Sequence, residues 1–149
     1  MRWALCRNDP DHWLTRGDPD GNQRLVAIND GDFKQALDRY KYPNRHPQRN
    51  QADYRSEAVA CLIEPLEAAL ATKGYLGGDL PCWADAAIFP FVRQFAGVDA
   101  VWWEASPWAG IRRWLHTWQS SALFARCMHK YALWVPDAAP VQFPPPPLA

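Results

Sequence analysis

The chain has 149 residues, the length of one ordinary domain. Its 16 Lys and Arg residues balance its 16 Asp and Glu residues, so no excess positive charge is available to bind a phosphate backbone. The most apolar run, residues 86–92, is far shorter than the ~20 residues that a membrane span requires. Arg7, Asp9 and Asp11 interrupt the region where a secretory signal would have its apolar stretch. We therefore expect a cytoplasmic protein with no nucleic-acid and no membrane partner.

The cysteines do not suggest a metal or redox site. Cys6, Cys61, Cys82 and Cys127 are widely separated and lack the paired spacing of zinc ligands or of a redox pair. Reduced thiols are the simplest expectation, and no metal is predicted. The nine tryptophans are many for this length, and such large rings usually anchor cores and interfaces.

The first twenty residues are predicted to be connecting chain. Residues 1–6 are apolar but too few for a stable isolated helix. Residues 8–21 contain repeated Asp, Gly and Pro, which are typical of turns. Trp13 and Leu14 lie in the middle of this stretch, so we expect the linker to be held against a surface.

Helical spacing of apolar residues begins after this linker. One stripe continues from Leu25 to Tyr40, and Gly31 interrupts it, so that Asp30 or Asp32 is expected to cap a new helix there. A second helix is predicted to start at Asn50 as its N-cap. Pro65 lies inside the stripe of that helix, and a kink is expected because proline lacks a backbone donor.

The second half of the chain also has a helical pattern. Residues 74–81 form a tight connection, and the almost wholly apolar residues after Cys82 predict a buried central helix, in which Arg93 is expected to pair with Asp99. Ser106 and Pro107 predict a cap and first turn for a helix over 108–118. A last helix is expected over 121–131, with its apolar residues inward: Leu123, Phe124, Cys127 and Met128. No alternating strand pattern is present, so the fold class is all-α.

The run from Tyr75 to Pro90, YLGGDLPCWADAAIFP, resembles the C-terminal domain of cytosolic glutathione transferases, in which a YL-x-G-x-x-x-S-x-A-D pattern opens a buried helix. Residues 91–96 and 128–134 are similar to bacterial members, and the likeness extends roughly over 14–134. The resemblance implies a helical bundle of that type. Cys82 stands where the family has Ser or Thr, so Cys82 and Asp85 are expected to be structural capping residues.

The resemblance also implies a domain organisation. In the family, an N-terminal thioredoxin-like domain supplies most of the glutathione site, including the residue that activates the thiol. Residues 1–20 are therefore expected to be the end of such a domain plus a linker, and residues 21–135 the helical domain. Residues 136–149 form a proline-rich tail that is expected to be extended or disordered, with docking to an aromatic groove of a partner as the alternative.

Five residues of the first long helix are candidates for binding substrate by their position in the family: Asn29, Asp30, Phe33, Lys34 and Tyr40. Each has a structural alternative, because Phe33 and Tyr40 fit core spacing, Asn29 and Asp30 fit helix caps, and Lys34 fits a solvated surface. No catalytic residue is predicted. Cys82 would benefit from a helix N-terminus as a thiolate, but Asp85 opposes that charge.

The predicted function is that of a glutathione S-transferase-like protein whose helical domain contributes the electrophile pocket and is inactive alone. Glutathione is expected as co-substrate only if a thiol site is completed, with a second copy of the chain or a separate thioredoxin-like domain as partner. The alternative is a non-catalytic protein-protein interaction module built on the same domain. The basic and aromatic residues over 39–49 also resemble a nucleic-acid groove, but a helix end followed by a loop explains them equally.

Overall fold

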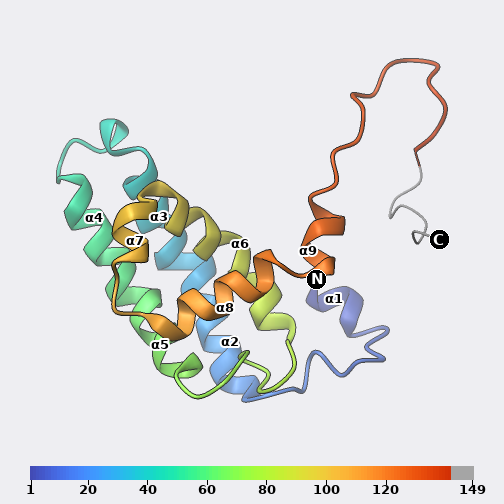
Figure 1. Ribbon diagram of the computed structural model, residues 1–149, viewed down its shortest axis with the longest axis horizontal. Helices are drawn as coiled ribbons and strands as arrows, with labels where there is room; N and C mark the ends of the chain where they lie inside the picture. Colours follow the sequence, from blue (N-terminus) through green and yellow to red (C-terminus); the bar gives the residue numbers. More distant parts are fainter. Residues whose placement is uncertain (142–149) are drawn as a thin grey trace. The chain divides into compact units, whose positions relative to one another are not determined.

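The computed structural model describes residues 1–141, and the end of the proline-rich tail, 142–149, lies outside the described residues. The chain forms two compact units, Met1–Leu115 and His116–Ala149. Helices make up the first unit (Figure 1): α1 (Arg2–Leu5), α2 (Pro19–Ile28), η1 (Asn29–Phe33), α3 (Lys34–Lys41), η2 (Pro43–Arg45), α4 (Gln51–Ala58), η3 (Val59–Ile63), α5 (Glu64–Leu70), α6 (Trp83–Val98), α7 (Ala100–Glu104) and the start of α8 (Ala109–Gln119). Helix α9 (Ala122–Cys127) lies in the second unit.

The predicted all-α fold is confirmed for the described part of the chain. Residues 1–141 contain no strand, and their only ladder contact is an isolated bridge between Tyr75 and Gly78 in the connection before α6. No helix within this range is long and apolar enough to cross a membrane.

Gly31 does not interrupt the first long helix, contrary to the expectation from the sequence. The helix continues from α2 through the π-helical turn η1 into α3, and neither Asp30 nor Asp32 caps a new start. The true cap lies earlier, where the Asp18 carboxylate accepts the Gly21 backbone N–H at 3.0 Å. A π turn absorbs an extra residue while keeping the helix continuous.

The second long helix starts as predicted, because the Asn50 side chain accepts the Asp53 backbone N–H at 2.9 Å. Another π turn, η3, lies directly before Glu64 and Pro65. Pro65 therefore lies in the first turn of α5, where proline is well tolerated, and the kink expected there stays a prediction. Helices α3 and α4 pack against each other, and the two π turns η1 and η3 are in contact.

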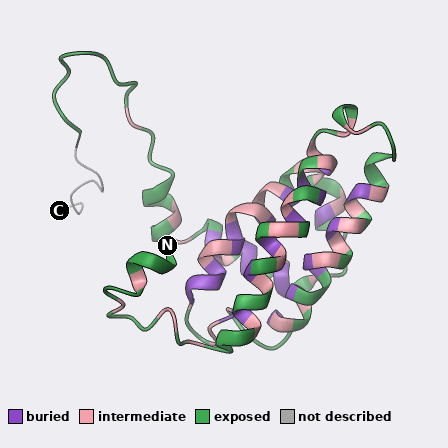
Figure 2. Ribbon diagram, turned by 180° about the vertical axis from the view of Figure 1, so that it is seen from behind, coloured by how far each residue is buried: buried purple, intermediate pink, exposed green. Residues whose placement is uncertain are grey.

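Helix α6 is the buried centre of the first unit, as its apolar sequence predicts. It packs against α2 and α3 and contains Pro90 without a break in the helix. Buried residues lie along these helices (Figure 2, purple). The largest wholly buried ones include Phe33, Tyr40, Leu62, Ile63, Leu66, Leu70, Ile88, Val92, Phe95, Ile111 and Trp114.

Helix α8 is capped differently from the prediction. It begins at Ala109, and the Glu67 carboxylate of α5 accepts the backbone N–H groups of Gly110 at 3.0 Å and Ile111 at 2.7 Å. The hydroxyl of Ser106, the predicted cap, is buried and has no hydrogen-bond partner among the described residues. A carboxylate that is distant in sequence but adjacent in space thus replaces the local cap.

The last helix starts as predicted, since the Ser121 hydroxyl accepts the Phe124 N–H at 3.1 Å, but it ends at Cys127. The expectation of a helix to residue 131 with an inward stripe is wrong. Leu123 and Met128 are about half exposed, and no residue of α9 is buried. Six residues make fewer than two helical turns and cannot form a continuous stripe.

The linker before α2 is held against the first unit, as Trp13 and Leu14 predicted. The Trp83 backbone N–H donates to the Trp13 carbonyl at 3.2 Å, and the Arg16 guanidinium donates to the Pro81 carbonyl at 2.8 Å. Gly17 has a φ of 77°, and a Cβ there would lie 2.2 Å from the Leu76 carbonyl oxygen. Only glycine fits this close approach between the linker and the turn before α6.

Candidate functional site

Two of the five predicted binding residues belong to the core. Phe33 and Tyr40 are 0% and 1% exposed, and their rings pack against Phe95 with centroid distances of 5.8 and 5.3 Å. Neither side chain faces a hollow that could take a ligand. The Tyr40 hydroxyl is buried without a hydrogen-bond partner among the described residues.

The other three lie around the π turn η1. Asn29 is fully buried, and its amide group donates to the Asp30 carboxylate at 3.1 Å. Asp30 and Lys34 form an ion pair at 2.8 Å on the surface, and the Lys34 ammonium lies 4.1 Å from the centre of the Phe91 ring of α6. The structure therefore brings Asp30 and Lys34 together and leaves Asn29 beneath them.

Asp30 and Lys34 line a surface hollow of about 410 Å³, here called the Asp38 hollow, together with Gly31, Gln35, Asp38, Arg39 and His46. Its charged groups are paired with one another or with a neighbour. His46 lies 3.3 Å from Asp38, and Arg39 lies 3.1 Å from Glu57 of α4. The lysine and the arginine of this hollow thus each have a carboxylate partner.

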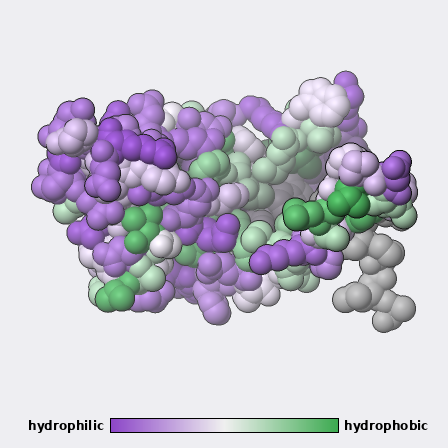
Figure 3. Space-filling model, turned by 90° about the horizontal axis from the view of Figure 1, so that it is seen from above, coloured by the Kyte–Doolittle hydropathy of each residue, from purple (hydrophilic) through white to green (hydrophobic). Residues whose placement is uncertain are grey.

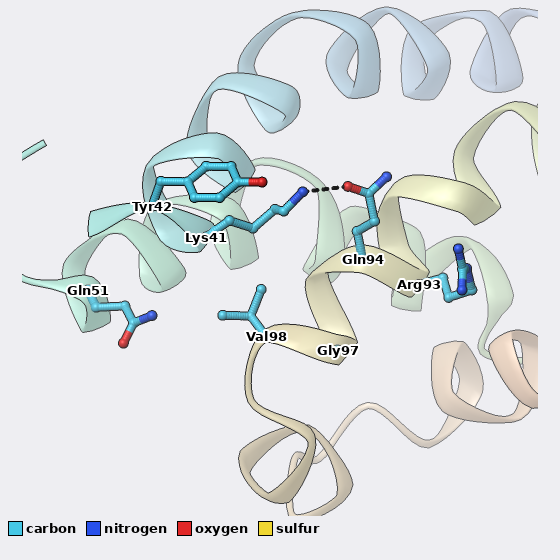
Figure 4. A pocket seen from close by; sticks show the side chains of 7 residues that line it. All are labelled: Lys41, Tyr42, Gln51, Arg93, Gln94, Gly97 and Val98. Atoms are coloured by element: carbon cyan, nitrogen blue, oxygen red, sulfur yellow. Dashed lines mark hydrogen bonds between the residues drawn. The ribbon is translucent and has the colours of Figure 1, made fainter. Parts of the chain in front are cut away.

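A larger hollow of about 530 Å³, here called the Lys41 hollow, lies where the end of α3, the start of α4 and the end of α6 come together. The Lys41 ammonium donates to the Gln94 side-chain oxygen at 2.8 Å across the gap between α3 and α6 (Figure 4). In that view, Arg93 stands at the edge opposite Gln51. The lining comprises Lys41, Tyr42, Gln51, Arg93, Gln94, Gly97 and Val98.

The Lys41 hollow has no acidic residue in its lining. Within residues 1–141, Lys41 forms no ion pair with a carboxylate. Asp99 directly follows Val98, and its carboxylate lies 3.6 Å from the Arg55 guanidinium, while the predicted pairing of Arg93 with Asp99 stays a prediction. The lining thus contains two cationic side chains, those of Lys41 and Arg93, and no carboxylate.

The surroundings of Tyr42 add to this positive character. The Arg45 guanidinium lies 4.4 Å and the Lys41 ammonium 5.2 Å from the centre of its ring. Seen from above, the end of the molecule that carries the 42–50 loop, at the left, is covered mostly by hydrophilic residues (Figure 3). The sequence analysis missed this hollow, although the basic and aromatic pattern over 39–49 already contained Lys41 and Tyr42.

The opposite end of α6 is fixed by the Asp85 node, the set of donors around the buried Asp85 carboxylate. It accepts the backbone N–H groups of Leu76 and Cys82, each at 2.8 Å, and of Gly77 at 3.3 Å. The indole N–H of Trp114 donates to it at 2.7 Å. The carboxylate therefore joins the connection before α6, the first turn of α6 and helix α8.

Cys82 completes a reciprocal capping box with Asp85, because its sulfur accepts the N–H of Asp85. The Asn22 side chain of α2 donates to the same sulfur at 3.4 Å. Burial, followed by the negative charge of Asp85, raises the pKa of Cys82 to about 12. The thiol is therefore protonated at neutral pH and unsuited to act as a nucleophile.

Comparison with protein families identifies the central part of the chain. Residues 51–117 match the family model of the glutathione S-transferase C-terminal domain. The matched segment, somewhat under half of the chain, is similar to that domain. The match confirms the resemblance drawn from residues 75–90, and it includes the Asp85 node and five of the seven residues of the Lys41 hollow. Comparison with curated proteins and with solved structures gave no match.

Among the described residues, Tyr40, Cys61 and Cys82 have raised pKa values, and a raised pKa disfavours the ionised form of each group. Burial raises the pKa of Cys61 to about 11, with Asp32 and Glu57 adding to the effect. Burial also raises the pKa of Tyr40, against the opposing influence of Arg55. Residues 1–141 contain no group of three or more metal-ligating side chains.

Proposed function

We propose that this chain provides the electrophile-binding half of a glutathione transferase-like protein, with the Lys41 hollow as its pocket. The observation that carries the proposal is an open hollow of about 530 Å³ at the ends of α3 and α6, in a chain whose residues 51–117 match the family model. Its volume suits a small organic molecule. The Tyr42 ring and the Val98 side chain would contact the apolar part of that molecule.

In the reaction of this family, the glutathione sulfur bonds to an electrophilic carbon, and the leaving group departs with the electron pair of the broken bond. A binding pocket holds the carbon beside the sulfur in the orientation that the reaction needs, which lowers the entropic part of the barrier. Asp30 and Lys34 remain candidates for contact with glutathione. They are surface residues of opposite charge, and glutathione carries both carboxylates and an ammonium group.

We further propose that the chain is inactive alone and that a thioredoxin-like domain completes the thiol site. The raised pKa values of Tyr40, Cys61 and Cys82 support this, because a thiol-activating group must favour a thiolate at neutral pH. The activating group would then come from outside the described residues. Four free cysteines fit a reducing compartment such as the cytoplasm.

The test is a pair of titrations on the whole chain. The neutral aromatic probe 3,5-dinitrobenzamide, titrated by calorimetry, is expected to bind saturably. Glutathione, followed by tryptophan fluorescence, is expected not to saturate at millimolar concentration. Saturable glutathione binding below millimolar would refute the view that the chain lacks a thiol site, and absence of probe binding would refute the pocket.

A matched pair of variants locates the binding. Tyr42→Ala removes an aromatic ring of the hollow whose centre lies 4.4 Å from the Arg45 guanidinium. Trp3→Ala removes a ring in α1 whose centre lies 3.9 Å from the Arg7 guanidinium. We expect weaker probe binding only for Tyr42→Ala. An equal loss in both variants would mean that the probe binds exposed rings without using the hollow.

A second candidate, the protein-protein interaction module, is favoured by exposed apolar side chains in the first unit. Trp3 is 69% and Val101 84% exposed, so both side chains are available for contact with a partner. Gel filtration distinguishes the two functions. A stable dimer or hetero-complex together with no probe binding would support the module, whereas a monomer that binds the probe would support the pocket.

A further inference from the structure

The two hollows beside α3 differ in how their cations are neutralised. In the Asp38 hollow, Lys34 and Arg39 each lie within 3.1 Å of a carboxylate. In the Lys41 hollow, the partner of the Lys41 ammonium is the neutral side-chain oxygen of Gln94. A half-buried cation with only a neutral partner gains more from a new anionic partner than one already paired with a carboxylate.

The donors around Lys41 are arranged to receive such a group. The ammonium has three N–H donors, and one is used by Gln94. Because Gln94 accepts with its oxygen, its amide nitrogen is left as a further donor on the same side of α6 (Figure 4). The Tyr42 ring stands beside them, with Arg45 over it at 4.4 Å. An anionic group and a flat ring therefore find complementary partners within one hollow.

We propose that the Lys41 hollow selects electrophiles that carry an anionic group, a carboxylate or a sulfonate, on a flat aromatic ring. This inference rests on the proposed function, since it names the substrate class of the same pocket. The anionic oxygen binds the Lys41 ammonium and the Gln94 amide, and the ring lies against Tyr42. Neutral electrophiles of the same shape bind more weakly because they leave Lys41 with Gln94 alone.

The size of the preference follows from the exposure of the site. Hydrogen bonds to charged groups are stronger than those between neutral groups, but in an open hollow water and salt weaken them. We expect a preference of about tenfold at low ionic strength, near the lower end for a charge-assisted contact. The preference should shrink as salt is added, whereas binding of a neutral ring should not.

The experiment compares two unreactive probes of nearly equal shape, 3,5-dinitrobenzoate and 3,5-dinitrobenzamide. Neither has a leaving group, so the exposed thiols of Cys6 and Cys127 are not arylated. Isothermal titration of the whole chain is expected to show tighter binding of the benzoate. If both bind equally, the anion preference is refuted and the pocket stands. If neither binds, the pocket itself is refuted.

Three variants assign the preference to Lys41. Lys41→Gln should bind the two probes equally, and Lys41→Arg should keep the preference because it keeps the charge. Lys73→Gln is the control, since it removes an exposed lysine that does not line the hollow. A preference lost equally in Lys73→Gln, or kept in Lys41→Gln, would overturn the proposal. Circular dichroism checks that each variant is folded.

Discussion

The two ends of α6 use polar groups in opposite ways. At its start, the Asp85 carboxylate accepts four donors and is wholly buried, so its hydrogen-bonding capacity is filled by the protein itself. At its end, Gln94 meets Lys41 in an open hollow with no carboxylate in the lining. A satisfied, buried polar group stabilises the fold, while an incompletely neutralised group at the surface remains available to a ligand.

The largest effect should come from removing the Asp85 node. Asp85→Ala leaves the N–H groups of Leu76 and Cys82 and the indole of Trp114 without their acceptor in a buried place. We expect the free energy of unfolding to fall by about 4 kcal/mol. Urea denaturation followed by circular dichroism measures it, with exposed Asp79→Ala as the control. A loss as small as that of the control would contradict the structural role of this end.

Alkaline pH should lower the free energy of unfolding through a group at the same end of α6, Cys82. The raised pKa of Cys82 means that its stabilising contribution is present below the unfolded value of 9.0 and is lost as pH rises toward about 12. We expect the free energy of unfolding to fall by up to about 4 kcal/mol over that range, since each pKa unit corresponds to about 1.4 kcal/mol. Cys82→Ser, which keeps a capping acceptor but does not titrate there, should lose less. An equal loss of stability in the unchanged chain and in Cys82→Ser would mean that other groups, such as Cys61 and Tyr40, cause the pH dependence.

A smaller effect is expected at the carboxylate that caps α8. Glu67→Ala leaves the N–H groups of Gly110 and Ile111 without a partner, which should lower the free energy of unfolding by about 1 to 2 kcal/mol. Glu64→Ala, an exposed position on the same helix, is the control and should change little. Equal midpoints in urea for the two variants would argue against the cap.

The smallest effect on stability should come from the other end of α6. Lys41→Gln removes a surface hydrogen bond to Gln94, so we expect a change below about 0.5 kcal/mol in the free energy of unfolding. The same change should abolish the preference for the anionic probe. A large loss of stability in urea would mean that Lys41 holds the fold, and the contrast between the two ends would then fail.

Local signals in the sequence predicted those parts of the fold that depend on neighbours along the chain. Asn50 caps its helix three residues before Asp53, and Cys82 and Asp85 stand at the spacing of a capping box. The cap of α8 could not be found in this way, because Glu67 precedes Gly110 by 43 residues. The two π turns were not predicted either, because no local residue pattern marks them. They contact each other in the structure.

The candidate site was less accessible to sequence reasoning than the fold. The helical spacing of Phe33 and Tyr40 fits core residues as well as pocket residues. Their burial and their ring contacts with Phe95 place both in the core. Lys41 and Gln94 are 53 residues apart, and no local pattern connects them.

The sequence by itself therefore determined an all-α chain, the start of its central helix and its resemblance to glutathione transferases, because helix periodicity and capping act over a few residues. The tertiary structure alone decided the partners of Arg39, Arg55 and Lys41, because Glu57, Asp99 and Gln94 lie far from them in sequence.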